Sequence, residues 1–309
     1  MPFNSPAHDI YFRTCIGTCN HDGNIRVYMQ DVMGNFREAT YDREWSNGTE
    51  KNVVAAAKLK SPVAVASMES EDIHVFYLAP NNMVKSAVYD HKRGWSVGDM
   101  GRMEIHTAPY SMMAANECSG LHGGRLYVQL PDNTIQEFGW SDESGWKKMT
   151  NLGPALPGTA ISCTSFKAPR VGLRVYFQDN HRVVKEKCFD DGRGWYDGGF
   201  KYTSSKALPP RVGMACTSHN ISSDKVGISV FVVSAQGLQE MVYDGSRWRE
   251  GKLDVECIPG SEVAVTCWGS GKDLQMRLYF QKGEHVSGIS EWMFRNEKWE
   301  AGKVALPPA

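Results

Sequence analysis

The sequence predicts an all-β protein, a six-bladed β-propeller with four short antiparallel strands in each blade. Three observations support this prediction. A strand-like phrase recurs six times at intervals of about 50 residues, each copy is followed by a second strand and a tryptophan, and helical periodicity is almost absent. No composition shift, linker or low-complexity tract divides the chain, so we expect one domain over residues 1–309.

The most regular element of the repeat is a strand rich in Val, Ile, Tyr and Phe, whose side chains alternate with a period of two. Its copies read NIRVYMQ, DIHVFYL, GRLYVQL, LRVYFQD, GISVFVV and MRLYFQK. They centre on Arg26, His74, Arg125, Arg174, Ser229 and Arg277, which are 48, 51, 49, 55 and 48 residues apart. This spacing indicates that each copy belongs to one blade.

Each unit contains three further strands. The strand that follows reads FREATYD, VKSAVYD, IQEFGWS, VKEKCFD, LQEMVYD or ISEWMFR. The turns before it contain Gly34, Asn81-Asn82, Asp132-Asn133, Asp179-Asn180, Gly237 and Gly283. A last strand holds the closing tryptophan. The opening strand reads TCIGTCN, VAVASME, SMMAANE, AISCTSF, GMACTSH or VAVTCWG, and its small side chains suit a crowded central channel.

The two ends of the chain belong to the same repeat pattern. The final VALPPA is similar to KALPPR before the fifth unit and to ALPG before the fourth, so the chain end leads into TCIGTCN. We therefore expect the first and sixth blades to be neighbours. Such closure removes the sheet edges that would otherwise promote aggregation.

The charge balance excludes several classes of protein. With 34 Lys and Arg against 35 Asp and Glu, the chain lacks the electrostatic footprint expected of a protein that binds nucleic acid or attaches to membranes through a polybasic segment, so we expect no nucleic acid partner. No apolar run approaches about 20 residues, and the first residues lack the pattern of a secretory signal. We expect a soluble protein, either cytoplasmic or carried to the spore or cell surface without a signal peptide.

Eight cysteines show neither a CxxC pair nor the spacing of a zinc site. Most of them stand among small apolar residues. We therefore expect free thiols that pack as small hydrophobic side chains, with no metal and no other cofactor.

Charged residues recur at fixed positions, which a scaffold alone does not require. An Arg in the regular strand precedes a Glu in the next strand, a spacing that can place both on one face of a hairpin. The pairs are Arg26 and Glu38, Arg125 and Glu137, Arg174 and Glu186, and Arg277 and Glu291. They could be ligand contacts or ion pairs between blades that satisfy partly buried charges.

Two aromatic positions also recur, the first always three residues after the Glu position. The pairs are Tyr41 and Trp45, Tyr89 and Trp95, Trp140 and Trp146, Phe189 and Trp195, Tyr243 and Trp248, and Phe294 and Trp299. They could simply pack the blades. Together with the Arg donors and the Glu acceptors, however, an aromatic face matches the mixed polar and apolar surface of a sugar ring.

The second and fifth repeats depart from this pattern. In the second, His74 and Ser86 stand at the Arg and Glu positions, although both aromatic positions are kept. In the fifth, Ser229 replaces the Arg, while Glu240 remains 11 residues later. The scaffold and the polar pair are therefore separable within this chain.

These residues resemble the fungal fucose-binding lectins of the Aleuria and Aspergillus type. The similar phrases are IRVYMQD, REATYDREWSNGTEKNV, RLYVQLPDNTIQEF, LRVYFQD and the closing ALPPA, and the resemblance covers nearly the whole chain. It implies a six-bladed propeller with fucose sites between adjacent blades, no metal and no enzymatic activity. It also implies a homodimer whose partners are fucosylated glycans and glycoproteins of host or self cell surfaces.

The resemblance further implies that the Arg and Glu of one blade bind fucose hydroxyls while the aromatic pair of the next blade supplies an indole N–H and an apolar wall. Four expected sites combine Arg26 and Glu38 with Tyr89 and Trp95, Arg125 and Glu137 with Phe189 and Trp195, Arg174 and Glu186 with Tyr243 and Trp248, and Arg277 and Glu291 with Tyr41 and Trp45. Two expected degenerate sites combine His74 and Ser86 with Trp140 and Trp146, and Ser229 and Glu240 with Phe294 and Trp299.

Two other classes of protein share some of these features. SDESGW, YDHKRGW and DDGRGW are similar to the Asp-box turns of sialidase propellers, but a glycosidase needs one asymmetric centre, whereas the acidic positions here are spread one per blade. A kelch-like interaction propeller shares the period of about 50 residues but has paired glycines in each blade. Both alternatives remain open, and dependence of binding on fucose distinguishes them from a lectin.

Overall fold

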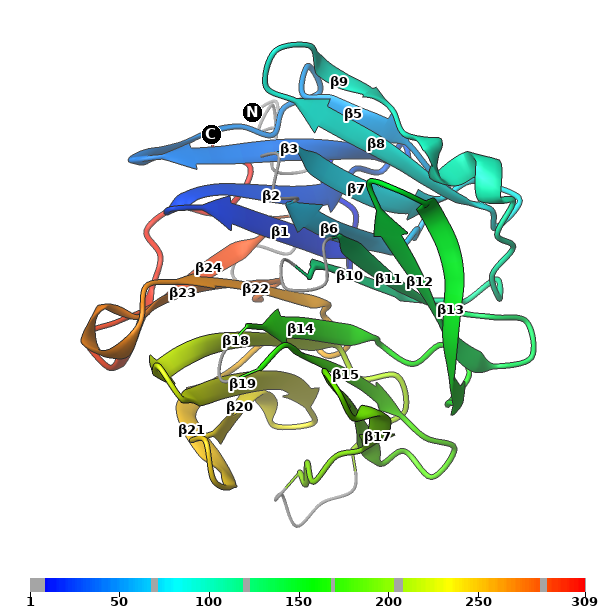
Figure 1. The fold of residues 1–309 in the computed structure, drawn as a ribbon. Helices are drawn as coiled ribbons and strands as arrows, with labels where there is room; N and C mark the ends of the chain where they lie inside the picture. The colour runs from blue at the N-terminus through cyan, green and yellow to red at the C-terminus, as the bar shows by residue number, and fades with distance from the viewer. Residues whose placement is uncertain are drawn as a thin grey trace.

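The computed structural model describes residues 9–67, 72–118, 123–167, 170–202, 208–283 and 288–308. These residues form six antiparallel sheets, each of which follows the order of the chain (Figure 1). Helix is limited in the described residues to short 3₁₀ segments such as Asp99–Met103 and Gly271–Asp273. None of the helices there is long and apolar enough to cross a membrane. The predicted six-bladed propeller with four strands per blade is confirmed.

The first three blades contain the strands that the repeats predict. Blade 1 consists of β1 (Ile16–His21), β2 (Asn24–Gln30), β3 (Asn35–Asp42), β4 (Glu44–Asn47) and an additional β5 (Val53–Ala56), which pairs with β3. Blade 2 consists of β6 (Val63–Ser67), β7 (Ile73–Leu78), β8 (Val84–Asp90) and β9 (Gly94–Val97). Blade 3 consists of β10 (Met113–Glu117), β11 (Gly124–Gln129), β12 (Thr134–Ser141) and β13 (Gly145–Pro154).

The other three blades repeat this arrangement. Blade 4 consists of β14 (Ser162–Phe166), β15 (Gly172–Gln178), β16 (Val184–Asp190) and β17 (Gly194–Asp197). Blade 5 consists of β18 (Met214–Ser222), β19 (Lys225–Ser234), β20 (Gly237–Tyr243) and β21 (Trp248–Val255). Blade 6 consists of β22 (Val263–Trp268), β23 (Gln275–Phe280), β24 (Ser290–Arg295) and β25 (Lys298–Ala301).

The opening strands of the blades form the inner ring of the propeller. Each contacts the opening strands of both neighbouring blades, and β1 contacts β6 on one side and β22 on the other. The small residues predicted for these strands are needed there, because a Cβ on Gly17 would lie 2.6 Å from the Val65 side chain. The first and sixth blades are therefore neighbours, as the similarity of the chain end to the earlier blade entries predicts.

Buried glutamines link four blades to the segments that enter the next ones. Each lies at or just after the end of the second strand, and its Nε2 donates to a backbone carbonyl of the entering segment. The bonds run from Gln30 to Lys58 at 2.7 Å, from Gln129 to Leu156 at 3.1 Å, from Gln178 to Pro209 at 3.0 Å and from Gln281 to Tyr11 at 3.3 Å. The last bond closes the ring, because it connects blade 6 to the segment before blade 1.

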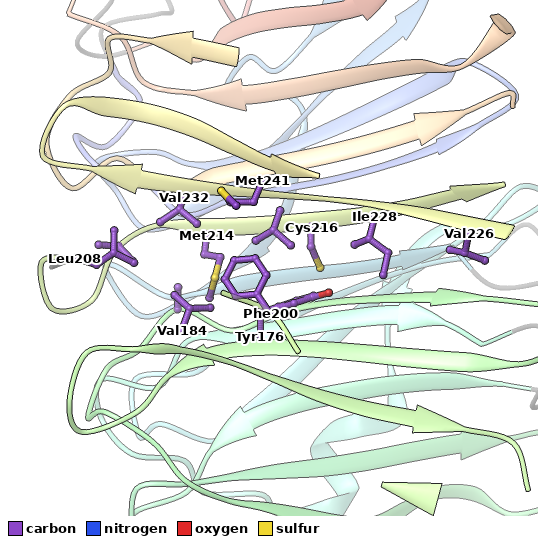
Figure 2. Close-up of a cluster of buried hydrophobic side chains, with 13 residues drawn as sticks. Tyr176, Val184, Phe200, Leu208, Met214, Cys216, Val226, Ile228, Val232 and Met241 are labelled. Carbon is purple, nitrogen blue, oxygen red and sulfur yellow. The ribbon is translucent and has the colours of Figure 1, made fainter. Parts of the chain in front are cut away.

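Apolar side chains fill the space between adjacent sheets. Figure 2 shows the cluster at the boundary of blades 4 and 5, where Tyr176 and Val184 face Met214, Val232 and Met241. Tyr176 is completely buried. Because removing apolar surface from water contributes about 25 cal/mol per Å², these clusters hold neighbouring blades in a fixed relation. That relation determines which side chains can meet across a blade boundary.

The eight cysteines are free thiols. Five are buried, whereas Cys163, Cys257 and Cys267 are partly exposed. Cys267 also accepts a hydrogen bond from Thr217 at 2.9 Å, so its thiol is more than an apolar filler. Burial raises the pKa of Cys19 and Cys216 to about 12, which keeps them protonated and poorly nucleophilic.

A few parts of the predicted phrases lie outside the described residues. They are the last two residues of VAVASME, the first two of KALPPR, the final residue of VALPPA, and positions 284–287 of the long turn between β23 and β24. The additional strand β5 and the bulges in β13 and β21 have no counterpart in the predicted repeat.

Candidate functional site

We number the six boundaries between blades by the blade that precedes them, so that position 1 lies between blades 1 and 2 and position 6 between blades 6 and 1. At position 1 the strand register pairs Tyr28 with Glu38 and Arg26 with Thr40. Arg26 and Glu38 are therefore diagonal neighbours on one face of the sheet. Arg26 Nη1 donates to Glu38 Oε1 at 3.0 Å.

The polar pairs of blades 3 and 6 also meet within one blade. Arg125 Nε lies 3.3 Å from Glu137 Oε1, and Arg277 Nε lies 3.5 Å from Glu291 Oε1. Both guanidinium groups are buried, whereas the Arg26 side chain keeps 30% of its surface exposed. Because each of these pairs lies in a single blade, the alternative of ion pairs between blades is wrong for them.

Blade 4 departs from the expected pairing. Arg174 Nη1 lies 3.0 Å from Asp190 Oδ1 and also donates to the carbonyl oxygens of Leu173 and Phe189. Glu186 accepts instead from the Phe200 backbone N–H at 2.9 Å. Arg174 therefore pairs with Asp190 and not with Glu186.

Asp190 could not be singled out from the sequence. Asp42, Asp90 and Asp244 occupy the same position in other repeats, but only in blade 4 does the structure give an ion pair from this Asp to the Arg position. Whether Arg174 pairs with Asp190 or with Glu186 depends on the rotamer of its long side chain. Strand periodicity carries no information on that rotamer.

The tryptophans of each blade face the preceding blade, as the sequence predicts. Each lies edge to face with an aromatic ring of that blade, with interplanar angles of 86° to 89°. The contacts are Tyr28 with Trp95, Phe76 with Trp146, Tyr127 with Trp195, Tyr176 with Trp248, Phe231 with Trp299, and Tyr279 with Trp45. The same geometry thus recurs at all six boundaries.

Indole N–H groups reach the carboxylates across these boundaries. Trp45 Nε1 donates to Glu291 Oε2 at 3.4 Å, and Trp299 Nε1 donates to Glu240 Oε2 at 3.2 Å. At position 1 the guanidinium carbon of Arg26 lies 4.9 Å from the centre of the Tyr89 ring. Polar residues of one blade and aromatic residues of the next therefore form shared sites.

The other members of the aromatic pairs lie beside their tryptophans. Ring centres are 5.2 to 5.7 Å apart within five blades. These pairs are Tyr41 with Trp45, Tyr89 with Trp95, Phe189 with Trp195, Tyr243 with Trp248, and Phe294 with Trp299. Five of the six boundaries, all except position 2, thus have a two-ring wall.

Position 1 contains a cavity of about 470 Å³. Arg26 and Tyr89 line it, together with Ile73, which the sequence did not single out. Ile73 opens the regular strand of the next blade, and the equivalent Leu173 and Ile228 are buried. Its apolar identity is also what a strand core requires, so the sequence offered no separate signal for it.

Position 2 lacks the polar geometry of the other boundaries. Three buried polar atoms there, His74 Nδ1, Ser86 Oγ and Trp146 Nε1, have no hydrogen-bond partner within the part of the chain that the structure describes. Burial lowers the pKa of His74, so this imidazole is neutral at pH 7. Trp140 lies beside it, 6.4 Å from the imidazole centre.

Position 5 keeps its carboxylate in place without an arginine. Ser229 Oγ donates to Glu240 Oε1 at 3.0 Å, and the Lys252 backbone N–H donates to Oε2 at 3.2 Å. The cavity at this boundary, which Phe294 also lines, measures about 630 Å³ and is larger than that at position 1. The space that a guanidinium would occupy is therefore open.

In blades 1, 3, 4 and 6 a tyrosine lies beneath the glutamate carboxylate, and the sequence reasoning did not single it out. It stands two residues after the Arg, and its hydroxyl donates to the Glu Oε1. The bonds are Tyr28 to Glu38 at 2.9 Å, Tyr127 to Glu137 at 3.5 Å, Tyr176 to Glu186 at 2.8 Å, and Tyr279 to Glu291 at 3.0 Å. A signal existed, because the repeats read R-x-Y four times but H-x-F and S-x-F in the two degenerate ones.

A glycine closes the space behind the Glu186 carboxylate, and its substitution should be destabilising. A Cβ on Gly198 would lie 2.1 Å from Glu186 Oε2, which Phe200 holds by its backbone N–H. We expect Gly198→Ala to lower the free energy of unfolding in urea by about 1–3 kcal/mol. Gly199→Ala is the matched control, because no atom lies within 4 Å of its Cβ. Equal effects of the two substitutions would contradict this account.

Comparison with known proteins places this arrangement in a family. Residues 10–309 match the family model described as fungal fucose-specific lectin. A fucose-specific lectin of Aspergillus fumigatus is 39% identical to the chain over 98% of both proteins. That of Aleuria aurantia is 29% identical over 90% of both.

Solved structures agree with this result. The SapL1 lectin in complex with alpha methyl fucoside superposes with a TM-score of 0.88 at 36% identity, over 99% of this chain and 100% of that one. The six-bladed Aleuria aurantia lectin superposes with a TM-score of 0.81 at 26% identity, over 97% of both chains. With its whole repeat matched and its fold shared, this chain belongs to the family of fungal fucose-specific lectins.

Proposed function

We propose that the protein is a lectin that binds L-fucose in fucosylated glycans at the boundaries between its blades. Positions 1, 3, 4 and 6 are the competent sites, and positions 2 and 5 are degenerate. The observation that carries this proposal is the recurrence, at each competent position, of an arginine, a glutamate held by a buried hydroxyl, and a tryptophan of the next blade.

This combination suits a neutral sugar with one apolar side. The guanidinium offers several N–H donors in a planar fork, and the carboxylate offers acceptor sites for hydroxyl groups. The two-ring aromatic wall can cover C–H groups and the methyl group of fucose. Relatives support the choice of sugar, since solved structures include SapL1 with alpha methyl fucoside and an Aleuria aurantia lectin variant with Fucalpha1-6GlcNAc.

The degenerate positions lack part of this combination. Position 2 has neither a guanidinium nor a carboxylate, because His74 and Ser86 replace them. Position 5 retains Glu240, but Ser229 offers one hydroxyl that is already used in holding the carboxylate. Loss of a charged donor costs roughly 1.5–3 kcal/mol, so we expect at least tenfold weaker binding there.

The proposal assigns no catalytic residue. The glutamates of the repeat are spread over five blades instead of forming one pair about a scissile bond, which hydrolysis of a glycoside requires. A hydrolase and a kelch-like interaction propeller are therefore the less supported alternatives. We further propose a homodimer whose partners are fucosylated cell-surface glycans.

A glycan array with free L-fucose as competitor tests the function directly. We expect binding to fucosylated glycans only, and its loss when free L-fucose is added in excess. Chelation with EDTA should leave haemagglutination unchanged, because Arg, Glu and Trp already provide complete hydrogen-bonding and stacking sites. Binding that is independent of fucose would favour the interaction propeller, and restoration by calcium after EDTA would reject a metal-free site.

Acidification should weaken binding at positions 3 and 6. Burial raises the pKa of Glu137 and Glu291 above the ordinary value of 4.5, although Arg125 and Arg277 beside them act in the opposite direction. A protonated carboxyl loses acceptor strength, so fucoside affinity should fall as the pH drops, beginning above the pH at which an ordinary glutamate titrates. Calorimetric titration of an R26A/R174A variant between about pH 7 and pH 4 measures this.

The matched control replaces both carboxylates in the same background. Glu137→Gln with Glu291→Gln should bind more weakly at neutral pH and show no further loss on acidification. A fucoside affinity that stays constant over the whole pH range in the R26A/R174A variant would contradict the assigned role of the carboxylates.

A further inference from the structure

A buried hydroxyl group occurs beneath the carboxylate in every blade that has a glutamate at the repeat position. All five glutamates at the repeat position accept an O–H bond on Oε1, from a tyrosine in four blades and from Ser229 in blade 5. Blade 2, which has Ser86 in place of the glutamate, has Phe76 in place of the tyrosine. The hydroxyl is therefore present wherever a carboxylate is present.

The aromatic ring and its hydroxyl have separable roles. Phe76 and Phe231 are as completely buried as the four tyrosines, and they make the same edge-to-face contact with the tryptophan of the next blade. The ring alone is therefore sufficient for packing at a blade boundary. Packing does not explain why four blades carry a polar atom in a fully buried place, where an unpaired hydroxyl would be costly.

The phenol hydroxyls remain available as donors to the carboxylates at any pH near neutrality. Burial raises the pKa of Tyr28 and Tyr279 well above the usual value of 10, so both phenols stay protonated. The donors on the other carboxylate oxygen come from different elements, namely Trp45 on Glu291 and backbone N–H groups on Glu137, Glu186 and Glu240. These four carboxylates are thus held from both sides before any ligand arrives, whereas at Glu38 both Arg26 and Tyr28 donate to Oε1.

We propose that Tyr28, Tyr127, Tyr176 and Tyr279 are positioning residues for sugar binding, which fix the carboxylate of their blade in the orientation that accepts sugar hydroxyls. They do not touch the sugar themselves. This inference rests on the proposed function. It adds a third polar residue to each competent site. It also explains the hydrogen bond of Ser229 in blade 5, where Phe231 stands at the tyrosine position and Ser229 supplies the hydroxyl instead.

The test uses position 6, where the surroundings of the carboxylate are well defined. Arg277 and Tyr279 from β23 face Glu291, and Trp45 donates to it from β4. Tyr41 from β3 interacts electrostatically with Tyr279. In an R26A/R125A/R174A variant, position 6 is the one competent site that keeps its arginine. Tyr279→Phe then removes one hydroxyl and leaves a ring that Phe76 and Phe231 already show to fit.

We expect two changes in Tyr279→Phe. Calorimetry with methyl α-L-fucoside should show about threefold to tenfold weaker binding at pH 7. Carbon-13 NMR of the glutamate carboxyl groups should show a higher pKa for Glu291, because the hydroxyl stabilises its charged form. A purely structural tyrosine would not move this pKa. Unchanged affinity together with an unchanged Glu291 pKa would overturn the proposal.

Two further variants make the test specific. Tyr127→Phe should raise the pKa of Glu137 less, because its bond of 3.5 Å is longer than the 3.0 Å of Tyr279. Ser229→Ala removes the equivalent hydroxyl from Glu240 Oε1 and should shift the carbon-13 resonance of the Glu240 carboxyl group at neutral pH. If the background variant binds no fucoside, the proposed function fails, while the carboxyl pKa values still decide whether the hydroxyls hold the carboxylates.

Discussion

Replacement of Arg26, Arg125, Arg174 and Arg277 together by alanine is expected to abolish binding to fucosylated surfaces while the propeller remains folded. Each substitution removes the donor fork of one site, and hydrogen bonds from a charged group contribute roughly 1.5–3 kcal/mol each, so every competent site should weaken at least tenfold. The fold should survive, because His74 and Ser229 occupy the same strand position in this chain. Surface plasmon resonance on a fucosylated surface, with circular dichroism for the fold, measures both expectations.

The control must remove arginine charge elsewhere. Arg93 and Arg247 suit this purpose, because 84% and 82% of their side-chain surface is exposed and their ion-pair partners are Asp90 and Asp244, not the repeat glutamates. Arg93→Ala with Arg247→Ala should bind like the unaltered protein. Full retention of binding by the fourfold variant would show that the aromatic wall and the carboxylates suffice, and that arginine is the wrong criterion for a competent site.

Single sites can be separated in crystals soaked with methyl fucoside. We expect sugar density beside Arg26, Arg125, Arg174 and Arg277, and Arg277→Ala should remove only the sugar that Tyr41 and Trp45 enclose. Equal sugar occupancy beside His74 and Ser86 would reject the division into competent and degenerate positions.

Weak single sites with strong binding to surfaces are the second large effect that we expect. Fucose has about 11 heavy atoms, and roughly 0.5 kcal/mol per atom gives a dissociation constant near ~100 μM. Several such sites around one ring should raise the apparent affinity for a fucosylated surface by ~10²–10⁴, because each later contact is intramolecular. Calorimetry with monovalent methyl fucoside measures the affinity of a single site, and plasmon resonance on fucosylated surfaces of varied density measures the apparent affinity for a surface.

The density series provides the control. At low density, where neighbouring fucose residues are too far apart for simultaneous contact, the apparent affinity should fall to that of methyl fucoside. Nanomolar binding of the monovalent sugar at every site would refute the multivalent explanation.

Much of the architecture is a local property of the sequence. A period of two within strands, turn residues between them and a unit of about 50 residues are each encoded by neighbours in the chain, so the six blades and their strands could be predicted. The resemblance to the fucose-binding lectins implied which aromatic pair faces which polar pair. The contact of β1 with β22 follows from the same order.

The partners of individual polar atoms could not be predicted in this way. Arg174 pairs with Asp190 although its spacing from Glu186 equals that of Arg26 from Glu38. The bond from Trp45 to Glu291 joins residues 246 positions apart. Such contacts depend on the rotamers of long side chains and on the angle between neighbouring sheets.

The sequence by itself therefore determined the number of blades, the order of strands and the ring closure, and its resemblance to the lectin family implied the residue types that meet at each boundary. Only the tertiary structure decided that Arg174 turns to Asp190, that a tyrosine lies beneath the carboxylate in four blades, and that Ser229 takes that place in the fifth. The physical reason is that backbone periodicity is set by near neighbours, whereas a hydrogen bond requires atoms within about 3 Å, a distance that only the packing of whole blades defines.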